Sequence, residues 1–478
     1  MSLVKETNYK SDNVNMPHYR YARIPLNNLP SGAVAWQPTS ETLLEWRVPA
    51  NTVFNLSKSY ISIGSMSLPA LAGSYGVSYE DGFPFRRCQF SNGSGLNIVD
   101  IQYADCWVNT ELPYRTKFED FKQNDQLEAL YPSRQLQTSN IVPMSLDGLT
   151  AGTVNATSVP YDEKQYLRFS TGVNTALNLS KLVPLSAVCD SNFDQPQDQI
   201  FGTDMYIRMW SNYLQRMFFY TDTPASPNNG TNTAVTASIT ATNVYLYLAI
   251  EQNLDIVNNM VTSLAGGRIR YNILWPYVYR VSSASTATNA SLVWTKNYGK
   301  GVKRMTIVPY NANETTACYA YDHSNVNGTK VSQFQVAIDG RPLTDQLVYN
   351  YNPNSSVNPP VAGGQLWNSP QQFADDWREM RAQINQSCVL GYPMFQTNWK
   401  YSVQWGMKSG DNDYPLSDAQ IFDYFDLLQS GDHTMSLQGQ TPTYGVAGNS
   451  ITNGVITYIM MLYTRTLHVL PNGIELGL

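Results

Sequence analysis

Hydrophobic and polar residues alternate along much of the chain, with the two-residue period of β-strands rather than the period of helices. The alternating stretches are rich in Val, Ile, Phe and Tyr, and turn-forming residues separate them. In the first half they occupy 43–63, 95–109, 164–189, 203–221 and 242–250. Many short strands separated by turns are typical of a β-sandwich or a barrel.

The strand pattern is interrupted at 251–267 and then starts again. This segment, EQNLDIVNNMVTSLAGG, predicts one or two helical turns that end at Gly266-Gly267. The later strand candidates are 268–282, 291–297, 303–310, 331–338, 346–351, 397–407 and 454–470. Each half of the chain is therefore strand-rich and ends on an apolar strand, although no residue-level repeat relates the halves. We expect two domains of similar architecture.

Three segments have the apolar spacing of helices. The clearest is 370–385, where Ser369 is the predicted N-cap and Pro370 takes the first helical position. A second helix is predicted at 417–430 and a weaker third at 115–131. Because all three interrupt strand-rich regions, they predict helical inserts between the strands of a sandwich.

Composition narrows the class of protein. The 478 residues suffice for two or three domains with a large core. Charged residues make up only 14% of the chain, against roughly 25% in an average soluble domain. Hydrophobic residues reach 42%, with 32 Tyr and 10 Trp, which excludes a disordered chain. The net charge of −6 provides no basic field, so we expect no sequence-specific nucleic-acid binding.

The cysteines and the start of the chain indicate a reducing compartment. The five cysteines are odd in number and widely spaced, which favours reduced core thiols: Cys88, Cys106, Cys189, Cys318 and Cys388. The first residues, MSLVKETNYKSDN, contain no apolar stretch of a secretory signal. The best apolar run, 455–463, is about half of the ~18 residues that a membrane helix needs. We expect a soluble protein that is not secreted through a signal peptide.

No motif of catalytic or metal chemistry is convincing. The four histidines have no metal-ligand spacing: His18, His323, His433 and His468. The nucleophile elbow, the phosphate-binding loop and the dinucleotide fingerprint do not occur. Asp375-Asp376 resembles a glycosidase pair and 411–413 the opening of a calcium loop, but a solvated helix face and a polar turn explain them better. We therefore assign no catalytic residue, no cofactor-binding residue and no metal ligand.

Asparagine and aromatic patterns have structural explanations. The ten Asn-x-Ser/Thr sequons are close to the number that chance predicts: Asn55, Asn92, Asn155, Asn178, Asn229, Asn289, Asn313, Asn327, Asn354 and Asn385. Asn-Gly pairs that begin at 92, 229, 327, 453 and 472 predict tight turns. Trp107 and the aromatic run 275–277 fit a core or a subunit interface better than a sugar platform.

Four features resemble the double jelly-roll major capsid proteins. This lineage includes tailless icosahedral phages, adenovirus, the large nucleocytoplasmic viruses, virophages and polinton-like viruses, and the chain is similar in size to the last two. Segment 181–212 resembles an apolar strand and Pro-containing loop that lead into a long strand, and 243–257 resembles the end of a first roll. The predicted helices at 115–131 and 370–385 match inserts carried by each roll, and 453–478 is similar to the final strand and apolar tail.

The resemblance implies an all-β fold of two consecutive eight-stranded antiparallel jelly-roll β-sandwiches, with a few helical inserts and long loops. Residues 1–30 would form an extended N-terminal arm, 31–257 the first roll and 258–478 the second. The implied function is structural: a homotrimer with six rolls, forming a pseudo-hexameric capsomer that tiles an icosahedral double-stranded DNA virus shell.

The same resemblance implies partners and a location. A penton protein and minor or cement proteins would complete a virion assembled inside the host cell. The outer loops would face the environment and offer a place for a host receptor or glycan. The candidate outer loops are 68–95, 132–162, 222–242, 310–330 and 350–369.

Three alternatives belong to other classes. A receptor-binding or glycan-binding fibre or adhesin would share this composition, although the chain has no shaft repeat. A polysaccharide-active enzyme would need two carboxylates that converge in a cleft. A single jelly-roll capsid protein with long insertions is the third alternative. The restart of strands at 268 and the late strand at 454–470 favour two rolls over one.

Overall fold

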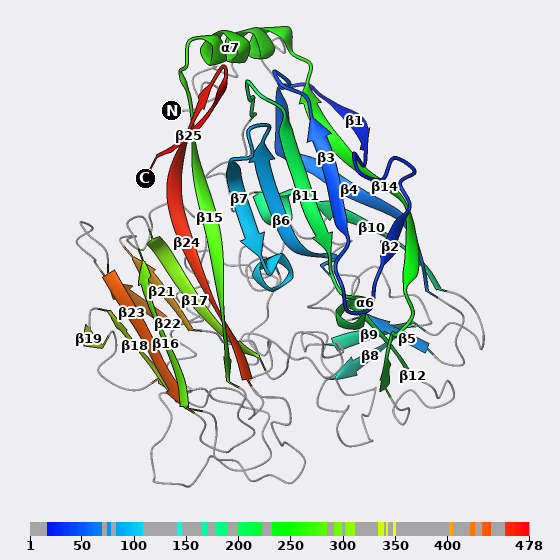
Figure 1. Ribbon diagram of the computed structural model, residues 1–478. Coiled ribbons are helices and arrows are strands. Elements are labelled where there is room, and N and C mark those ends of the chain that lie inside the picture. Colours follow the sequence, from blue (N-terminus) through cyan, green and yellow to red (C-terminus); the bar gives the residue numbers. More distant parts are fainter. Residues whose placement is uncertain are drawn as a thin grey trace.

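The structure is a computed structural model. It describes residues 17–68, 74–77, 83–108, 141–145, 165–169, 177–189, 198–221, 232–283, 291–298, 302–310, 333–338, 341–342, 348–349, 401–405, 421–425, 433–440 and 455–477. Strands dominate these residues and are grouped in two bodies that stand side by side (Figure 1). None of the helices in the described ranges is long and apolar enough to cross a membrane.

The first body is a sandwich of two antiparallel sheets. One sheet has the order β1-β14-β4-β10, and β2 pairs with the far end of β14. Its strands are β1 (Tyr19–Pro25), β2 (Val34–Trp36), β4 (Phe54–Leu68), β10 (Leu177–Pro184) and β14 (Ile239–Glu251). The other has the order β3-β11-β6-β7, from β3 (Leu43–Val48), β6 (Phe85–Asn92), β7 (Asn97–Gln102) and β11 (Met205–Ser211). Apart from β6 and β7, neighbours in each sheet are distant in the chain, which is the jelly-roll arrangement.

Strict alternation positions these strands. In β11, Met205, Ile207 and Met209 are buried, and the residues between them are half-buried. Trp46 of β3 is fully buried opposite Ile207 in the register of the two strands. Burying each such side chain contributes about 1.5–3 kcal/mol. A shift by one residue would turn this apolar set outward, so burial fixes the register.

The second body repeats this strand order. Its first sheet has the order β15-β24-β17-β21-β22, and β25 pairs with β24. The strands are β15 (Ile269–Ser283), β17 (Val302–Tyr310), β21 (Tyr401–Trp405), β22 (Ile421–Phe425), β24 (Val455–Leu470) and β25 (Gly473–Gly477). The second sheet has the order β16-β23-β18-β19, with β20 also on β18. These strands are β16 (Ser291–Tyr298), β18 (Gln333–Ile338), β19 (Arg341–Pro342), β20 (Val348–Tyr349) and β23 (His433–Gln440). The predicted all-β double jelly roll is therefore confirmed.

A third, smaller sheet lies at one end of the first roll (Figure 1). Its order is β13-β12-β5-β9-β8, from β5 (Ser74–Val77), β8 (Ile141–Ser145), β9 (Gln165–Phe169), β12 (Phe218–Thr221) and β13 (Asn232–Ala234). The strands come from three different connections of the roll. Strand pairing gives the backbone groups of these long connections hydrogen-bond partners. The three excursions thus form one structure rather than separate loops.

This sheet corrects several sequence predictions. The predicted outer loops 68–95, 132–162 and 222–242 contain strands, and β6 even belongs to the sandwich. The many polar residues of β6 hide its strand character, although most of them are buried. The predicted strand pair at 95–109 contains one strand, β7, followed by a helical turn at 104–108. The loops 310–330 and 350–369 lie outside the described residues.

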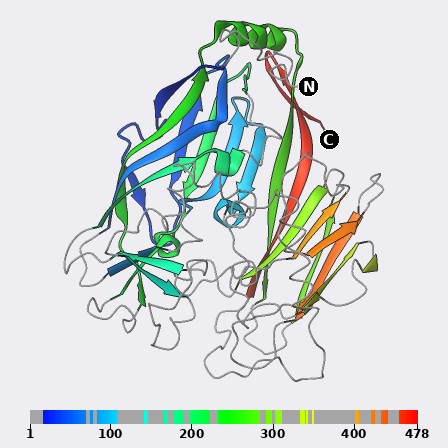
Figure 2. The ribbon, with the colours of Figure 1, turned by 180° about the vertical axis from the view of Figure 1, so that it is seen from behind.

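Helix α7 (Leu254–Ala265) lies between β14 and β15, across the end opposite the small sheet (Figures 1 and 2). The side chain of its N-cap, Asn253, accepts a hydrogen bond from the Asp255 amide at 3.0 Å. Gly267 ends it with φ of +60°, a conformation that favours glycine. The helix predicted in 251–267 is confirmed but has 12 residues rather than one or two turns. Two shorter helices among the described residues are α5 (Ser186–Cys189) and α6 (Leu214–Met217).

One predicted helix is wrong. Residues 421–425 form β22, which adds in parallel to the edge strand β21. Its sequence, IFDYF, fits both a helical stripe and an aromatic strand. The segment forms a strand because the edge of β21 offers it hydrogen-bond partners. The local sequence does not show that this edge is available. The helices predicted at 115–131 and 370–385 lie outside the described residues.

The N-terminal range also differs from the expected arm. Within 1–30, β1 pairs with β14 over seven residues, from Tyr19 opposite Glu251 to Pro25 opposite Tyr245. The Tyr19 hydroxyl also donates to Asp198 at 2.6 Å. Residues 19–25 are therefore an integral strand of the first roll, not part of a free arm.

We predict that the buried pair Asp105–Arg216 anchors α6 to the end of β7. The two side chains are fully buried, with a carboxylate to guanidinium distance of 3.0 Å. Asp105→Ala removes the paired carboxylate from a buried cation and should cost about 3–5 kcal/mol in urea unfolding. The double variant Asp105→Leu with Arg216→Met should lie much closer to the wild type. Equal losses in both variants would contradict this.

Candidate functional site

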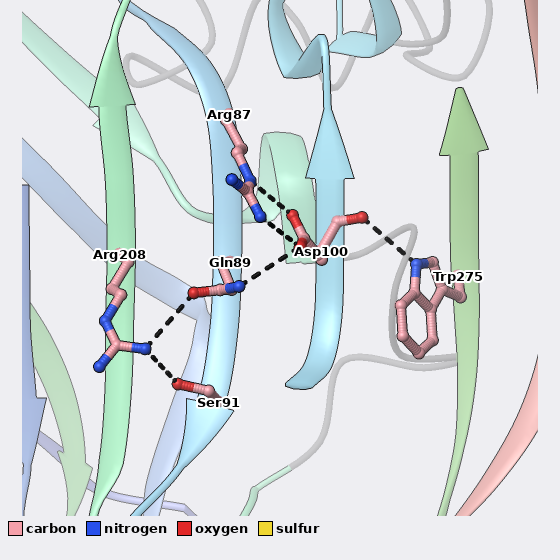
Figure 3. Close-up of polar contacts among 6 residues, drawn as sticks. All are labelled: Arg87, Gln89, Ser91, Asp100, Arg208 and Trp275. Carbon is pink, nitrogen blue, oxygen red and sulfur yellow. Dashed lines mark hydrogen bonds and ion pairs between the residues drawn. The ribbon is translucent and has the colours of Figure 1, made fainter. Parts of the chain in front are cut away.

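The two rolls meet where β15 passes β7. The indole N–H of Trp275 in β15 donates to the backbone carbonyl of Asp100 in β7 at 3.3 Å (Figure 3). The buried hydroxyl of Tyr271 accepts from the Ile200 amide at 3.0 Å, and burial raises the pKa of this tyrosine. The rings of Tyr103 and Tyr458 lie 5.0 Å apart, one from each roll. Hydrogen bonds and aromatic packing therefore hold the rolls together.

Close backbone contact completes this junction. Gly202 lies against Pro471 in the turn between β24 and β25, so that a Cβ at position 202 would clash with the Pro471 backbone. Phe201, next in the chain, packs its ring 6.1 Å from that of Tyr271. The absence of a side chain at Gly202 lets the terminal hairpin of the second roll touch the first roll directly.

A polar network covers the outer face of the sheet beside the junction (Figure 3). Arg87 binds the Asp100 carboxylate through two hydrogen bonds of 2.8 and 2.6 Å. Gln89 donates to the same carboxylate at 3.3 Å. Arg208 reaches across to Gln89 at 3.4 Å and to Ser91 at 3.0 Å. Since Cys88 and Phe90 point into the core, alternation along β6 turns Arg87, Gln89 and Ser91 to the other face of the sheet, where Gln89 and Ser91 are nonetheless buried.

The network continues to the edge strand β3. Arg208 donates to Glu45 at 2.6 Å, and Asn27 donates to the other carboxylate oxygen at 2.7 Å. Burial works to raise the pKa of Glu45, but the hydrogen bonds from Arg208 and Asn27 and the Arg208 charge outweigh it and lower the pKa. The Asp100 hydrogen bond raises the pKa of Arg87 despite partial burial. Each carboxylate of the network is thus paired with an arginine, which suits a structural role.

Aromatic rings flank both ends of this network. The Arg87 guanidinium lies 4.5 Å from the Trp210 ring centre, and Arg465 of the second roll lies 4.3 Å from that of Trp275. Cations above aromatic faces add roughly 0.5–1 kcal/mol each at exposed sites. Each of these two contacts lies within one roll, and the Trp275 hydrogen bond to Asp100 links β15 to β7. The groups pair with one another rather than presenting an activated nucleophile.

The structure places the candidates singled out in the sequence mostly in structural roles. Trp107 is a core residue, and Trp275 is part of the junction. The sequon residues Asn55 and Asn92 are 2% exposed. Asn55 donates to Asp198 at 3.1 Å and Asn92 accepts from the Leu96 amide at 2.8 Å. Burial keeps both side chains from a glycan.

Of the other candidates, the described ones pack in or beside the core, and the rest lie outside the described residues. Cys88 and Cys106 are buried and form no disulfide, as expected of core thiols. His468 lies half-buried, with Nε2 2.9 Å from the Gly267 carbonyl oxygen. No group of three or more metal-binding side chains occurs in the ranges that the structure describes. Asp375, Asp376 and the segment 411–413 lie outside them.

Sequence reasoning missed the network and Gly202. The alternating polar residues of β6 and β11 are a visible signal that one sheet face is polar. Their pairing partners lie far away in the chain, however: Arg208 and Glu45 are 163 positions apart. Only strand order brings them together.

Comparisons with known proteins support the fold. No protein-family model matches the chain, and no curated protein sequence does. A chain in the structure of the Sputnik virophage is 10% identical, with a TM-score of 0.50 over 93% of this chain and 88% of that one. A chain of the PBCV-1 virus capsid is 9% identical, with a TM-score of 0.49 over 99% of both. The mavirus major capsid protein is 8% identical, with a TM-score of 0.46 over 96% of this chain and 90% of that one. The likeness to the Sputnik chain identifies the fold as the double jelly roll.

We predict that Gly202→Ala loosens the junction. The added methyl group must displace the Pro471 backbone, which should lower the free energy of unfolding by about 1–3 kcal/mol. Gly473→Ala is the matched control, because a Cβ there meets no atom within 4 Å. Thermal unfolding of both variants checks this, and equal melting temperatures would contradict it.

We predict that Glu45 makes the first roll sensitive to acid. A carboxyl whose pKa is lowered by folding adds stability above its ordinary pKa and loses it as pH falls through the folded-state value. The Glu45→Gln variant should therefore lose about 1 kcal/mol at pH 7 and show a smaller fall in melting temperature from pH 7 to pH 4. Parallel pH curves for wild type and variant would rule this out.

Proposed function

We propose that this chain is a major capsid protein, with a structural rather than an enzymatic role. The observation that carries the proposal is the repetition of one jelly-roll strand order twice in a single chain, with a fixed junction between the rolls. Three copies would bring six rolls around one axis and so form a pseudo-hexameric block. Such blocks tile an icosahedral shell around double-stranded DNA, as the sequence resemblance implies.

The division of the chain follows from the same proposal. The first roll runs from β1 to β14 and the second from β15 to β25, with α7 as the link. The boundary expected at 257/258 falls inside α7, so we place the division at the helix rather than at one residue. An arm reaching a neighbouring copy would be confined to residues before β1.

The two ends of the molecule suit different surroundings. The small sheet gathers three long connections at one end, while α7 closes the other (Figure 2). We propose that the end with the small sheet faces outward and offers the surface for a receptor or glycan. Penton and minor or cement proteins would complete the shell. Buried thiols without a disulfide at Cys88 and Cys106 fit assembly in the reducing interior of a host cell.

The second full set of strands disfavours a single-roll capsid protein. The polar network disfavours the enzyme alternative at the junction, because its carboxylates pair with arginines and amides. A fibre or adhesin has no specific observation in its favour.

The test is the mass of the purified protein in solution by light scattering. The proposal predicts one species at three times the chain mass of 53.6 kDa, with near-hexagonal particles in negative-stain images. A trimeric fibre head would have the same mass but another outline. A monodisperse monomer at high concentration would refute the capsomer.

A further inference from the structure

An aromatic surface covers the outer face of the sheet β1-β14-β4-β10. It consists of Tyr21, Tyr60, Tyr245, Tyr247 and Leu182, which we call the tyrosine face. On the opposite side of the same sheet Ile61, Ile63, Leu246 and Leu248 are fully buried in the core. Alternation along the strands therefore turns the tyrosines away from the core.

The rings of the tyrosine face are already ordered against one another. Tyr60 and Tyr247 are opposite in the register and stack at 4.9 Å with an angle of 10° between their planes. Tyr21 joins them from β1 at 5.6 Å. The Arg23 guanidinium lies 4.8 Å from the Tyr245 ring centre. Because the rings are held in place before any contact, a partner would bind them at a small cost in side-chain entropy.

This face is open to solvent in the single chain. Among the described residues, five large hydrophobic side chains are exposed, and two of them, Tyr21 at 48% and Leu182 at 38%, lie on it. Tyrosine and arginine are the residues that protein interfaces favour, and they often carry most of the binding energy. The surface thus has the composition of an interface, and no other described part of the chain covers Tyr21 and Leu182 fully.

The position of the face indicates what covers it. In both views, β15 and β24 lie on one side of the first roll and β1 and β14 on the other (Figures 1 and 2). Contact between the rolls of one chain uses β7 and β15. In a ring of alternating first and second rolls, each first roll needs a second contact, on the side that its own second roll leaves free. Such head-to-tail contacts close into a ring when the rotation between copies allows it.

We propose that the tyrosine face binds the second roll of a neighbouring copy of this chain and so closes the trimer. The inference rests on the proposed function and adds to it the surface that joins one copy to the next. The contact is heterologous: the tyrosine face of one copy meets a different surface of the next, not another tyrosine face.

The test is a pair of charge substitutions on this face. The double variant Tyr21→Glu with Leu182→Glu places two carboxylates among the rings at positions that tolerate polar side chains in the monomer. The dissociation constant of the trimer should rise at least 100-fold, so that light scattering finds the 53.6 kDa monomer where the wild type is trimeric. The matched control is Leu254→Glu on α7, which is 72% exposed and lies at the end of the molecule.

The outcomes separate the two proposals. A wild type that is trimeric, with a double variant that stays equally trimeric, overturns the tyrosine face and leaves the capsomer standing. A monomeric wild type overturns both. The melting temperature of the double variant should match that of the control. If the double variant is much less stable, the labelling experiment tests the tyrosine face instead.

The labelling experiment does not depend on breaking the trimer. Tyr21→Cys and Leu254→Cys are each exposed in the single chain, whereas Cys88 and Cys106 are buried and should react slowly with a maleimide. In the assembled protein, the cysteine at position 21 should react at least 10-fold more slowly than the one at position 254. Similar rates at the two positions would overturn the proposal.

Discussion

The long ladder between β15 and β24 is the interaction on which the two-roll arrangement depends. It pairs the strands from Ile269 opposite Val469 to Ser283 opposite Val455. The end of the ladder near α7 packs against the first roll, and Tyr271 and Leu467 are buried there. Toward its other end, β17 pairs with β24 and so extends the sheet of the second roll. One pair of strands thus serves two bodies. A separate linker would leave the angle between the rolls free, whereas a shared ladder fixes it.

The contacts at the junction differ in what they contribute. Tyr271 and Phe201 exclude water, and Gly202 permits the backbone approach of Pro471. The Arg87–Asp100 pair is half-exposed, so its net contribution to stability is small. Its value lies in orientation, because the two parallel hydrogen bonds between guanidinium and carboxylate define a plane. Apolar burial therefore provides most of the affinity between the rolls. The polar network orders the face of the first roll beside the junction, and the Trp275 hydrogen bond to the Asp100 carbonyl connects that face to β15.

The proposed assembly uses the same chemistry on a larger scale. The first roll has one sheet that faces the second roll and another that carries the tyrosine face, and each would meet a different roll in a closed ring. The low charge of the chain reduces repulsion between repeated copies. Identity of 10% to the Sputnik chain of the same fold is compatible with this, because alternation and strand order can persist while individual residues change.

The sequence by itself determined the class of fold. Alternation along segments such as β11 and β14 is local, and so the all-β character and the restart after α7 could be predicted from short windows. Strand order depends on residues far apart, such as Tyr19 opposite Glu251, and local periodicity says nothing about such partners. For the same reason β22 resembled a helix and the Glu45–Arg208 pair was not foreseen. Only the tertiary structure decided which polar residues met at the junction and which tyrosines remained in solvent, because both depend on the packing of whole sheets.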